Sequence, residues 1–128
     1  MKDGDLVLTD QGHYVHHYAS DITNCFPVNG KFTQKQKEIY DLVLKANREV
    51  FAAVKPGVNW KDMHIKAEFI ILEGLKSLGL LNGDVEEMQK KRIGYIFMPH
   101  GLGHLIGLDC HDAGGYHKGV CETPQRDT

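Results

Sequence analysis

The fold is decided by residues 5–46, which read DLVLTDQGHYVHHYASDITNCFPVNGKFTQKQKEIYDLVLKA. The short apolar run at residues 5–10 predicts a buried strand. Residues 14–21 are rich in aromatic and β-branched side chains and predict a second strand, which would pair with the first across a turn at Gly12-His13. The start of the chain therefore predicts an antiparallel hairpin.

Two long helices are predicted after the hairpin. Thr33 begins a T-x-x-Q capping box, and apolar residues then recur at helical intervals over residues 34–54. A second helix is predicted over residues 60–78, with Asn59 as its N-cap and Gly79 as its C-cap.

The later part of the chain predicts shorter elements. Asp84 would cap a short helix that ends near Lys91, and residues 94–98 (GYIFM) predict a strand. Residues 100–108 contain several glycines and are not expected to be helical, because each glycine in a helix interior costs about 1 kcal/mol. With the hairpin and the long helices, these elements predict an α+β fold built on an antiparallel sheet.

Asp10 and Asp21 would lie on neighbouring strands of the hairpin, where facing side chains come within about 5 Å of each other. Two carboxylates this close repel unless a cation lies between them, which favours a divalent-metal site. Aspartates also occur in turns of most proteins, so the pair is not specific on its own. A third ligand is needed to separate the two interpretations.

His100 and His104 enclose the segment HGLGH and would point to one face of an extended chain, because strand side chains alternate. The zinc-protease pattern H-E-x-x-H is absent from the sequence. The alternative interpretation is a glycine-rich turn whose histidines face solvent. His111, between Asp109 and Asp112, could stabilise a tetrahedral intermediate or transfer a proton.

The composition argues against several classes of function. The 128 residues carry a net charge of −2, which does not favour nucleic acid or an anionic membrane as a partner. No apolar run approaches the roughly 18–20 residues that span a membrane. The three cysteines show no C-x-x-C spacing, so we expect a reducing, cytoplasmic location and assign no catalytic role to Cys110. The eight histidines favour a metal site.

Three segments resemble one known family: residues 5–46, KPGVNWKDMH at 55–64, and FMPHGLGHLIGLDCHDAGGY at 97–116. They resemble the prolidase (Xaa-Pro dipeptidase) branch of the metallopeptidases that include methionine aminopeptidase, aminopeptidase P and creatinase. The resemblance implies the pita-bread fold. We therefore expect a partial pita-bread catalytic domain at residues 1–119 and a divergent, disordered tail at residues 120–128.

The resemblance also implies roles for single residues. Asp10, Asp21 and His104 match metal ligands, and Asp21 matches the ligand that bridges two ions. His111 matches a histidine that contacts substrate and stabilises the intermediate, and His100 matches one that lines the substrate pocket. The family favours manganese, which also suits a ligand set rich in oxygen and poor in sulfur. Water activated by two metal ions would attack the carbonyl before proline in a Xaa-Pro dipeptide.

The resemblance implies five protein ligands, and the sequence supplies three. The two remaining glutamates belong to segments that have no match here. One interpretation is a prolidase-type enzyme, a homodimer as in the family, represented by an incomplete catalytic domain. The alternative is a catalytically inactive fragment that only binds metal or pairs with another subunit. For the 128-residue chain alone we expect little or no dipeptidase activity.

Overall fold

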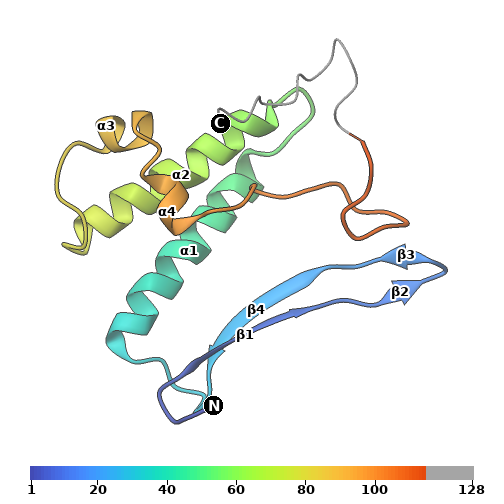
Figure 1. The fold of residues 1–128 in the computed structure, drawn as a ribbon, viewed down its shortest axis with the longest axis horizontal. Coiled ribbons are helices and arrows are strands. Elements are labelled where there is room, and N and C mark those ends of the chain that lie inside the picture. The colour runs from blue at the N-terminus through green and yellow to red at the C-terminus, as the bar shows by residue number, and fades with distance from the viewer. Residues whose placement is uncertain (115–128) are drawn as a thin grey trace. The chain divides into compact units, whose positions relative to one another are not determined.

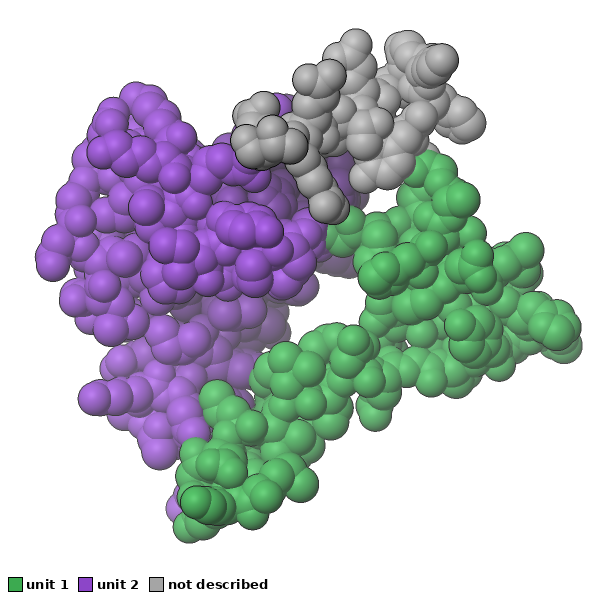
Figure 2. All heavy atoms as spheres, in the orientation of Figure 1, with its two compact units in different colours: residues 1–28, 103–128 green, residues 29–102 purple. Residues whose placement is uncertain are grey.

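The computed structural model describes residues 1–114, which belong to two compact units (Figure 1). Unit 1 joins residues 1–28 to the segment that begins at Gly103, and unit 2 comprises residues 29–102; Figure 2 shows them in different colours. The predicted tail lies outside the described residues, so the boundary at residue 119 stays a prediction. None of the described helices is long and apolar enough to cross a membrane.

Unit 1 contains a long antiparallel hairpin built from four strands: β1 (Leu6–Gln11), β2 (Tyr14–Val15), β3 (Tyr18–Ala19) and β4 (Ile22–Pro27). β1 pairs with β4, and β2 pairs with β3 at the far end of the same ribbon (Figure 1). The pairing of Gln11 with Ile22 continues in register into that of Tyr14 with Ala19. The predicted hairpin is confirmed, but residues 14–21 do not form one strand.

The turn of the hairpin lies at His16-His17, four residues after the predicted turn. Both residues have positive φ, 50° and 71°, as the central residues of a type I′ turn require. The sequence did not reveal this turn because asparagine and glycine, not histidine, are its usual signals. Gly12 lies instead where the two strands approach closely, since a Cβ on it would overlap the carbonyl oxygen of Ser20.

Unit 2 is helical and contains α1 (Gln34–Ala53), α2 (Trp60–Ser77), α3 (Val85–Lys90) and α4 (Gly94–Phe97). α1 packs along α2, and α3 and α4 also pack on α2 (Figure 1). The predicted capping box is confirmed: the Gln36 N–H donates to Thr33 Oγ1 at 3.3 Å, and the Thr33 N–H donates to Gln36 Oε1 at 2.8 Å. The Asp84 cap of α3 is also confirmed, since its carboxylate accepts from the Glu87 N–H at 3.0 Å.

The end of α2 follows the prediction at Gly79. This glycine has φ 73°, and its N–H donates to the Lys76 carbonyl at 2.9 Å. The next N–H, of Leu80, reaches back to the Leu75 carbonyl at 3.0 Å. This pair of bonds is the Schellman motif, which satisfies carbonyls that the last helical turn would leave without a partner.

The strand predicted at residues 94–98 is wrong, because Gly94–Phe97 forms the single helical turn α4. A short apolar run does not by itself distinguish a strand from a buried helical segment. Within the part of the chain that the structure describes, no strand pairs with this segment. α4 packs closely on α2 instead, since a Cβ on Gly94 would lie 3.0 Å from Glu68 Cγ.

Most of the buried apolar side chains of unit 2 belong to two clusters. Val50 and Met98 pack with residues of the first half of α2, and Leu72 packs with Val85 and Met88 of α3. Leu72 is completely buried. The apolar pattern of the sequence had instead predicted an inward stripe on this helix at Met63, Ala67, Ile70, Ile71, Leu75 and Leu78. A single stripe could not reveal it, because α2 is covered by α1 on one side and by α3 and α4 on others.

Candidate metal site in unit 1

The segment from Gly103 to Gly114 has neither helix nor strand, and hydrogen bonds hold it against the hairpin. The Ala19 N–H of β3 donates to the Gly107 carbonyl at 2.8 Å. The Asp112 N–H donates to the Leu105 carbonyl at 3.0 Å and closes the segment into a loop. This loop brings His104 and His111 to the start of β4, where Asp21 lies.

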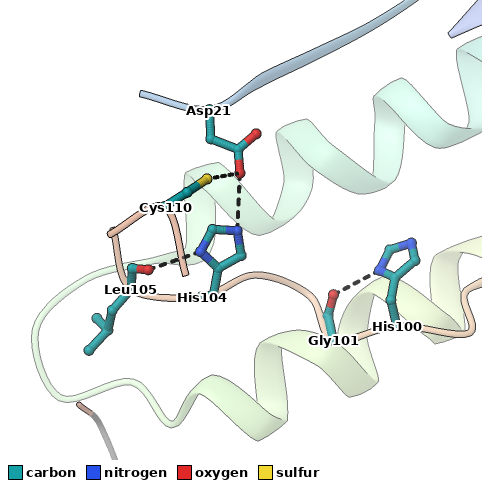
Figure 3. Close-up of polar contacts among 6 residues, drawn as sticks. All are labelled: Asp21, His100, Gly101, His104, Leu105 and Cys110. Atoms are coloured by element: carbon teal, nitrogen blue, oxygen red, sulfur yellow. Dashed lines mark hydrogen bonds and ion pairs between the residues drawn. The ribbon is translucent and has the colours of Figure 1, made fainter. Parts of the chain in front are cut away.

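Asp21 and His104 are 83 residues apart in sequence and in direct contact: His104 Nε2 lies 3.1 Å from Asp21 Oδ2 (Figure 3). The other ring nitrogen, Nδ1, lies 2.9 Å from the Leu105 carbonyl oxygen. A carbonyl oxygen only accepts hydrogen bonds, so Nδ1 carries a proton. This arrangement directs Nε2 at the carboxylate, as in metal sites where a backbone carbonyl fixes the tautomer of a histidine ligand.

The pKa of His104 is raised above its ordinary value. The hydrogen bond to the Leu105 carbonyl is the main cause; partial desolvation opposes it, and the Asp21 carboxylate adds to it through its hydrogen bond and its charge. The nearby carboxylate therefore favours the imidazolium form of His104.

His111 joins this pair. One ligand atom from each of Asp21, His104 and His111 lies within 4.8 Å of the others. The rings of the two histidines have centroids 4.1 Å apart and are tilted by 43°. His111 thus lies beside Asp21 and His104, and its role in contacting substrate and stabilising an intermediate stays a prediction.

Cys110 contacts the carboxylate of this cluster, although the sequence interpretation gave the cysteine no role. Its Sγ donates to Asp21 Oδ2 at 3.4 Å, the same oxygen that His104 approaches (Figure 3). The pKa of the thiol is raised, first by burial, then by its hydrogen bond to Asp21 and by the negative charges of Asp21 and Asp10. The only sequence signal was its position next to His111. A cysteine beside a histidine is too common to indicate a functional role.

The sequence interpretation expected Asp10 and Asp21 to face each other across the hairpin, but the structure does not pair them. The partner of Asp10 across the hairpin is Thr23, two residues after Asp21. Asp10 and Asp21 therefore share a face of the ribbon as diagonal neighbours, a relation in which side chains are about 7–8 Å apart. Asp10 is not one of the three residues whose ligand atoms cluster, but its charge reaches Cys110.

His100 belongs to unit 2, and its Nδ1 contacts the carbonyl oxygen of the adjacent Gly101 at 2.8 Å (Figure 3). Its role in lining a substrate pocket stays a prediction. An open hollow of about 480 Å³ on α1 and α2 is lined by Arg48, Glu49 and Lys66 with two alanines. None of the predicted site residues lines this hollow, so we assign it no chemistry.

The donors in unit 1 suit a divalent cation, since carboxylate oxygen and imidazole nitrogen bind manganese, iron, cobalt and zinc. Asp21 and His104 offer these atoms at contact distance, and both are about one-third exposed, so an ion can enter from solvent. On an α+β scaffold with two long helices, these features define a candidate metal-dependent enzyme site.

Comparison with known proteins then identifies the protein family. The sequence matches the model of metallopeptidase family M24 over residues 1–127, and the chain belongs to that family. It is 54% identical over 120 residues to the Xaa-Pro dipeptidase of Mus musculus. The match includes 94% of this chain and 24% of that protein.

Solved structures give the fold. Aminopeptidase PepP of Pseudomonas aeruginosa is similar with a TM-score of 0.89 and 46% identity, over 94% of this chain and 27% of that one. A zinc-substituted Escherichia coli aminopeptidase P in complex with product is similar with a TM-score of 0.88 and 46% identity, over 92% of this chain and 27% of that chain. The predicted partial pita-bread fold is confirmed, and the chain spans about a quarter of the length of these relatives.

Proposed function

We propose that this chain is part of the catalytic domain of a metal-dependent Xaa-Pro dipeptidase. The observation that carries the proposal is the contact between Asp21 Oδ2 and His104 Nε2, formed between segments 83 residues apart in a chain of family M24. The 54% identity to a mammalian Xaa-Pro dipeptidase supports the substrate class. Asp10 would be the third ligand from this chain, and a homodimer and a cytoplasmic location belong to the same proposal.

A bound divalent ion would supply an activated water and polarise the scissile carbonyl. Asp21 and His104 would hold the ion, with Nδ1 of His104 fixed by the Leu105 carbonyl. His111, beside both ligands, would stabilise the negative charge that develops on the carbonyl oxygen. His100 would contact the substrate. The metal of the proposal is manganese, as the family resemblance implies.

A segment exchange tests this proposal directly. The aligned 120-residue segment of the Mus musculus Xaa-Pro dipeptidase is replaced by the matching segment of this chain, and glycyl-proline hydrolysis is measured with manganese. We expect the chimera to hydrolyse glycyl-proline and the same chimera with Asp21→Asn to be inactive. Asp41→Asn, which changes an exposed aspartate on α1, is the matched control and should leave turnover unchanged.

Two further substrates define the specificity. Glycyl-leucine should be a poor substrate, because the proposed enzyme requires proline after the scissile bond. Cleavage of glycyl-prolyl-glycine in preference to glycyl-proline would favour an aminopeptidase, the activity named for the solved relatives. A folded chimera without any turnover would refute the proposal and favour the inactive, metal-binding or subunit-pairing alternative. The isolated 128-residue chain should show little or no activity.

A further inference from the structure

Two asparagines of the chain are followed directly by glycine. Asn29-Gly30 lies in the connection between β4 and α1, and Asn82-Gly83 lies in the connection between α2 and α3 (Figure 1). All four residues are exposed. An asparagine in this position can react with its own backbone, because glycine has no Cβ to shield its nitrogen from the neighbouring side chain. The two pairs therefore carry the same chemistry in different surroundings.

The reaction is an intramolecular attack of the Gly30 backbone nitrogen on Cγ of Asn29. A new C–N bond closes a succinimide ring, while the side-chain NH₂ group takes the proton of the glycine N–H and leaves as ammonia. Water then adds to one of the two ring carbonyls and opens the ring. The products are aspartate, or isoaspartate, in which the main chain runs through the former side chain. The reacting groups belong to adjacent residues, so proximity replaces an enzyme.

At Asn29 a hydrogen-bond donor already contacts the oxygen that becomes negative during this attack. The Lys31 N–H donates to Asn29 Oδ1 at 3.0 Å. Such a bond strengthens as charge develops on the acceptor, so it lowers the barrier to ring closure. None of the described residues accepts a hydrogen bond from the Gly30 N–H, and the attack therefore breaks no such bond.

The surroundings of Asn82 are less favourable. No residue in the described part of the chain donates to the Asn82 side chain. A Cβ on Gly83 would lie 3.3 Å from Met88 Cε, whereas a Cβ on Gly30 would meet no atom within 4 Å. Ring closure rotates the peptide group between asparagine and glycine, which open surroundings permit and a packed side chain resists.

Asn59 provides an internal comparison for the effect of glycine. Its side chain accepts from the backbone N–H two residues later at 2.9 Å, as that of Asn29 does. The next residue is Trp60, which begins α2, so the attacking nitrogen is held in a helix and carries a bulky neighbour. The remaining asparagines lie inside regular elements, Asn24 in β4 and Asn47 in α1. Asn29 thus combines the glycine, the donor and the open space.

We infer that Asn29 is the principal site of spontaneous deamidation in this chain, and that the folded structure makes it react faster than Asn82. The product carries a carboxylate in the connection where unit 1 ends at Val28 and unit 2 begins. Isoaspartate also adds a methylene to the main chain of that connection. The inference does not depend on the proposed peptidase, because none of the candidate metal ligands takes part.

Peptide mapping of the whole 128-residue chain tests the inference. The chain is incubated at mildly alkaline pH and digested, each asparagine peptide is quantified by mass spectrometry, and isoaspartate is detected by enzymatic methylation. We expect Asn29 to be converted several-fold faster than Asn82, and Asn59 to stay intact. Conversion at Asn82 or Asn59 that equals conversion at Asn29 would overturn the inference.

The same incubation in guanidinium chloride isolates the contribution of the fold without any variant. Unfolding removes the Lys31 hydrogen bond and the contact of Met88 with Gly83, so the rates at the two asparagines should become similar. An undiminished preference for Asn29 in the unfolded chain would assign it to the neighbouring sequence and would refute the structural cause.

A matched pair of variants tests the attacking nitrogen. Gly30→Ala adds a Cβ beside it and should slow conversion of Asn29 several-fold while that of Asn82 is unchanged. Gly83→Ala should have the reverse effect. Circular dichroism verifies that both variants keep the helices of unit 2. Conversion of Asn29 at the same rate in Gly30→Ala would show that the amide is lost by another route.

Discussion

Asp21 Oδ2 accepts from His104 and from Cys110, which are 83 and 89 residues further along the chain. Local structure orients both His104 and Asp21. The Leu105 carbonyl fixes the proton on His104 Nδ1, and the close approach of Gly12 to Ser20 fixes the backbone just before Asp21. A single oxygen atom therefore depends on the geometry of both segments, and substitution at Asp21 should affect every group of the cluster.

The first prediction concerns the pKa of His104 in the metal-free chain. Asp21→Asn removes the carboxylate that partners Nε2, so the pKa of His104 should fall. It should stay above its ordinary value, because the Leu105 carbonyl is the main cause of the shift and remains. Proton NMR titration of the His104 imidazole measures its pKa in the unaltered chain and in Asp21→Asn. Asp5→Asn, in the same unit, should leave the titration unchanged.

The same shift sets the direction of two pH effects. A raised pKa means that the imidazolium form stabilises the folded chain below the unfolded value, and that this contribution is lost as the pH rises through the folded value. Metal binding has the opposite dependence, because only neutral imidazole is a ligand. Manganese affinity should therefore fall as the pH is lowered through the raised pKa of His104. An affinity independent of pH across that range would exclude His104 as a ligand.

At the scale of elements, the N-terminus of α1 is fixed by reciprocal hydrogen bonds between Thr33 and Gln36. Thr33→Ala leaves the Gln36 N–H without its acceptor and should destabilise unit 2 by about 0.5–2 kcal/mol. Thr33→Ser keeps a hydroxyl cap and should have little effect. Urea unfolding followed by helical circular dichroism measures both variants, and equal midpoints for the two would show that the box does not stabilise the helix.

The contact between α1 and α2 gives the next prediction, at Gly74. A Cβ there would overlap the side chain of Leu42 on α1, so Gly74→Ala should destabilise the pair by about 1–3 kcal/mol, reduced by about 1 kcal/mol of gained helix propensity. In a Leu42→Ala background the overlap is removed. Gly74→Ala should then be neutral or stabilising, which a double-mutant cycle in urea would show. Additive effects would contradict the proposed overlap.

The elements also show how far local sequence signals extend. The caps at Thr33, Asn59 and Asp84 use side-chain chemistry within three residues, and all three helices begin where the sequence predicted. The segment at residues 94–98 was mistaken for a strand because its conformation depends on packing against α2. Leu72 was missed for a related reason, since its burial is due to α3, a separate element.

In the candidate site, too, local sequence patterns predict residue types better than contacts between distant segments. Asp21, His104 and His111 were expected from their residue types and from family resemblance, and the structure brings their ligand atoms together. The register that makes Asp10 a diagonal neighbour depends on a turn at His16-His17 that has no usual turn signal. Cys110 became visible only through a hydrogen bond to a residue 89 positions away, a contact that no spacing pattern encodes.

At the scale of the whole molecule, the two units differ in what stabilises them. The buried apolar side chains of the described residues belong almost entirely to unit 2, whereas unit 1 is a two-stranded ribbon with a loop hydrogen-bonded to it. An isolated two-stranded hairpin is marginally stable in water. The proposed metal ligands Asp10, Asp21 and His104 all lie in unit 1, so metal binding should stabilise the unit that has the weaker core.

Hydrogen exchange of the whole chain can test this difference. At a manganese concentration of about 100 times the dissociation constant, binding should stabilise unit 1 by about 2.7 kcal/mol, and exchange of its amides should slow accordingly. The N–H groups of Ala19 and Asp112, which hold the loop and the hairpin, are the reporters. Amides in the middle of α1 and α2 should be unchanged, because no ligand lies in unit 2. Asp21→Asn provides the control without a site, and protection spread equally over both units would show that the ion binds elsewhere or that the units unfold together.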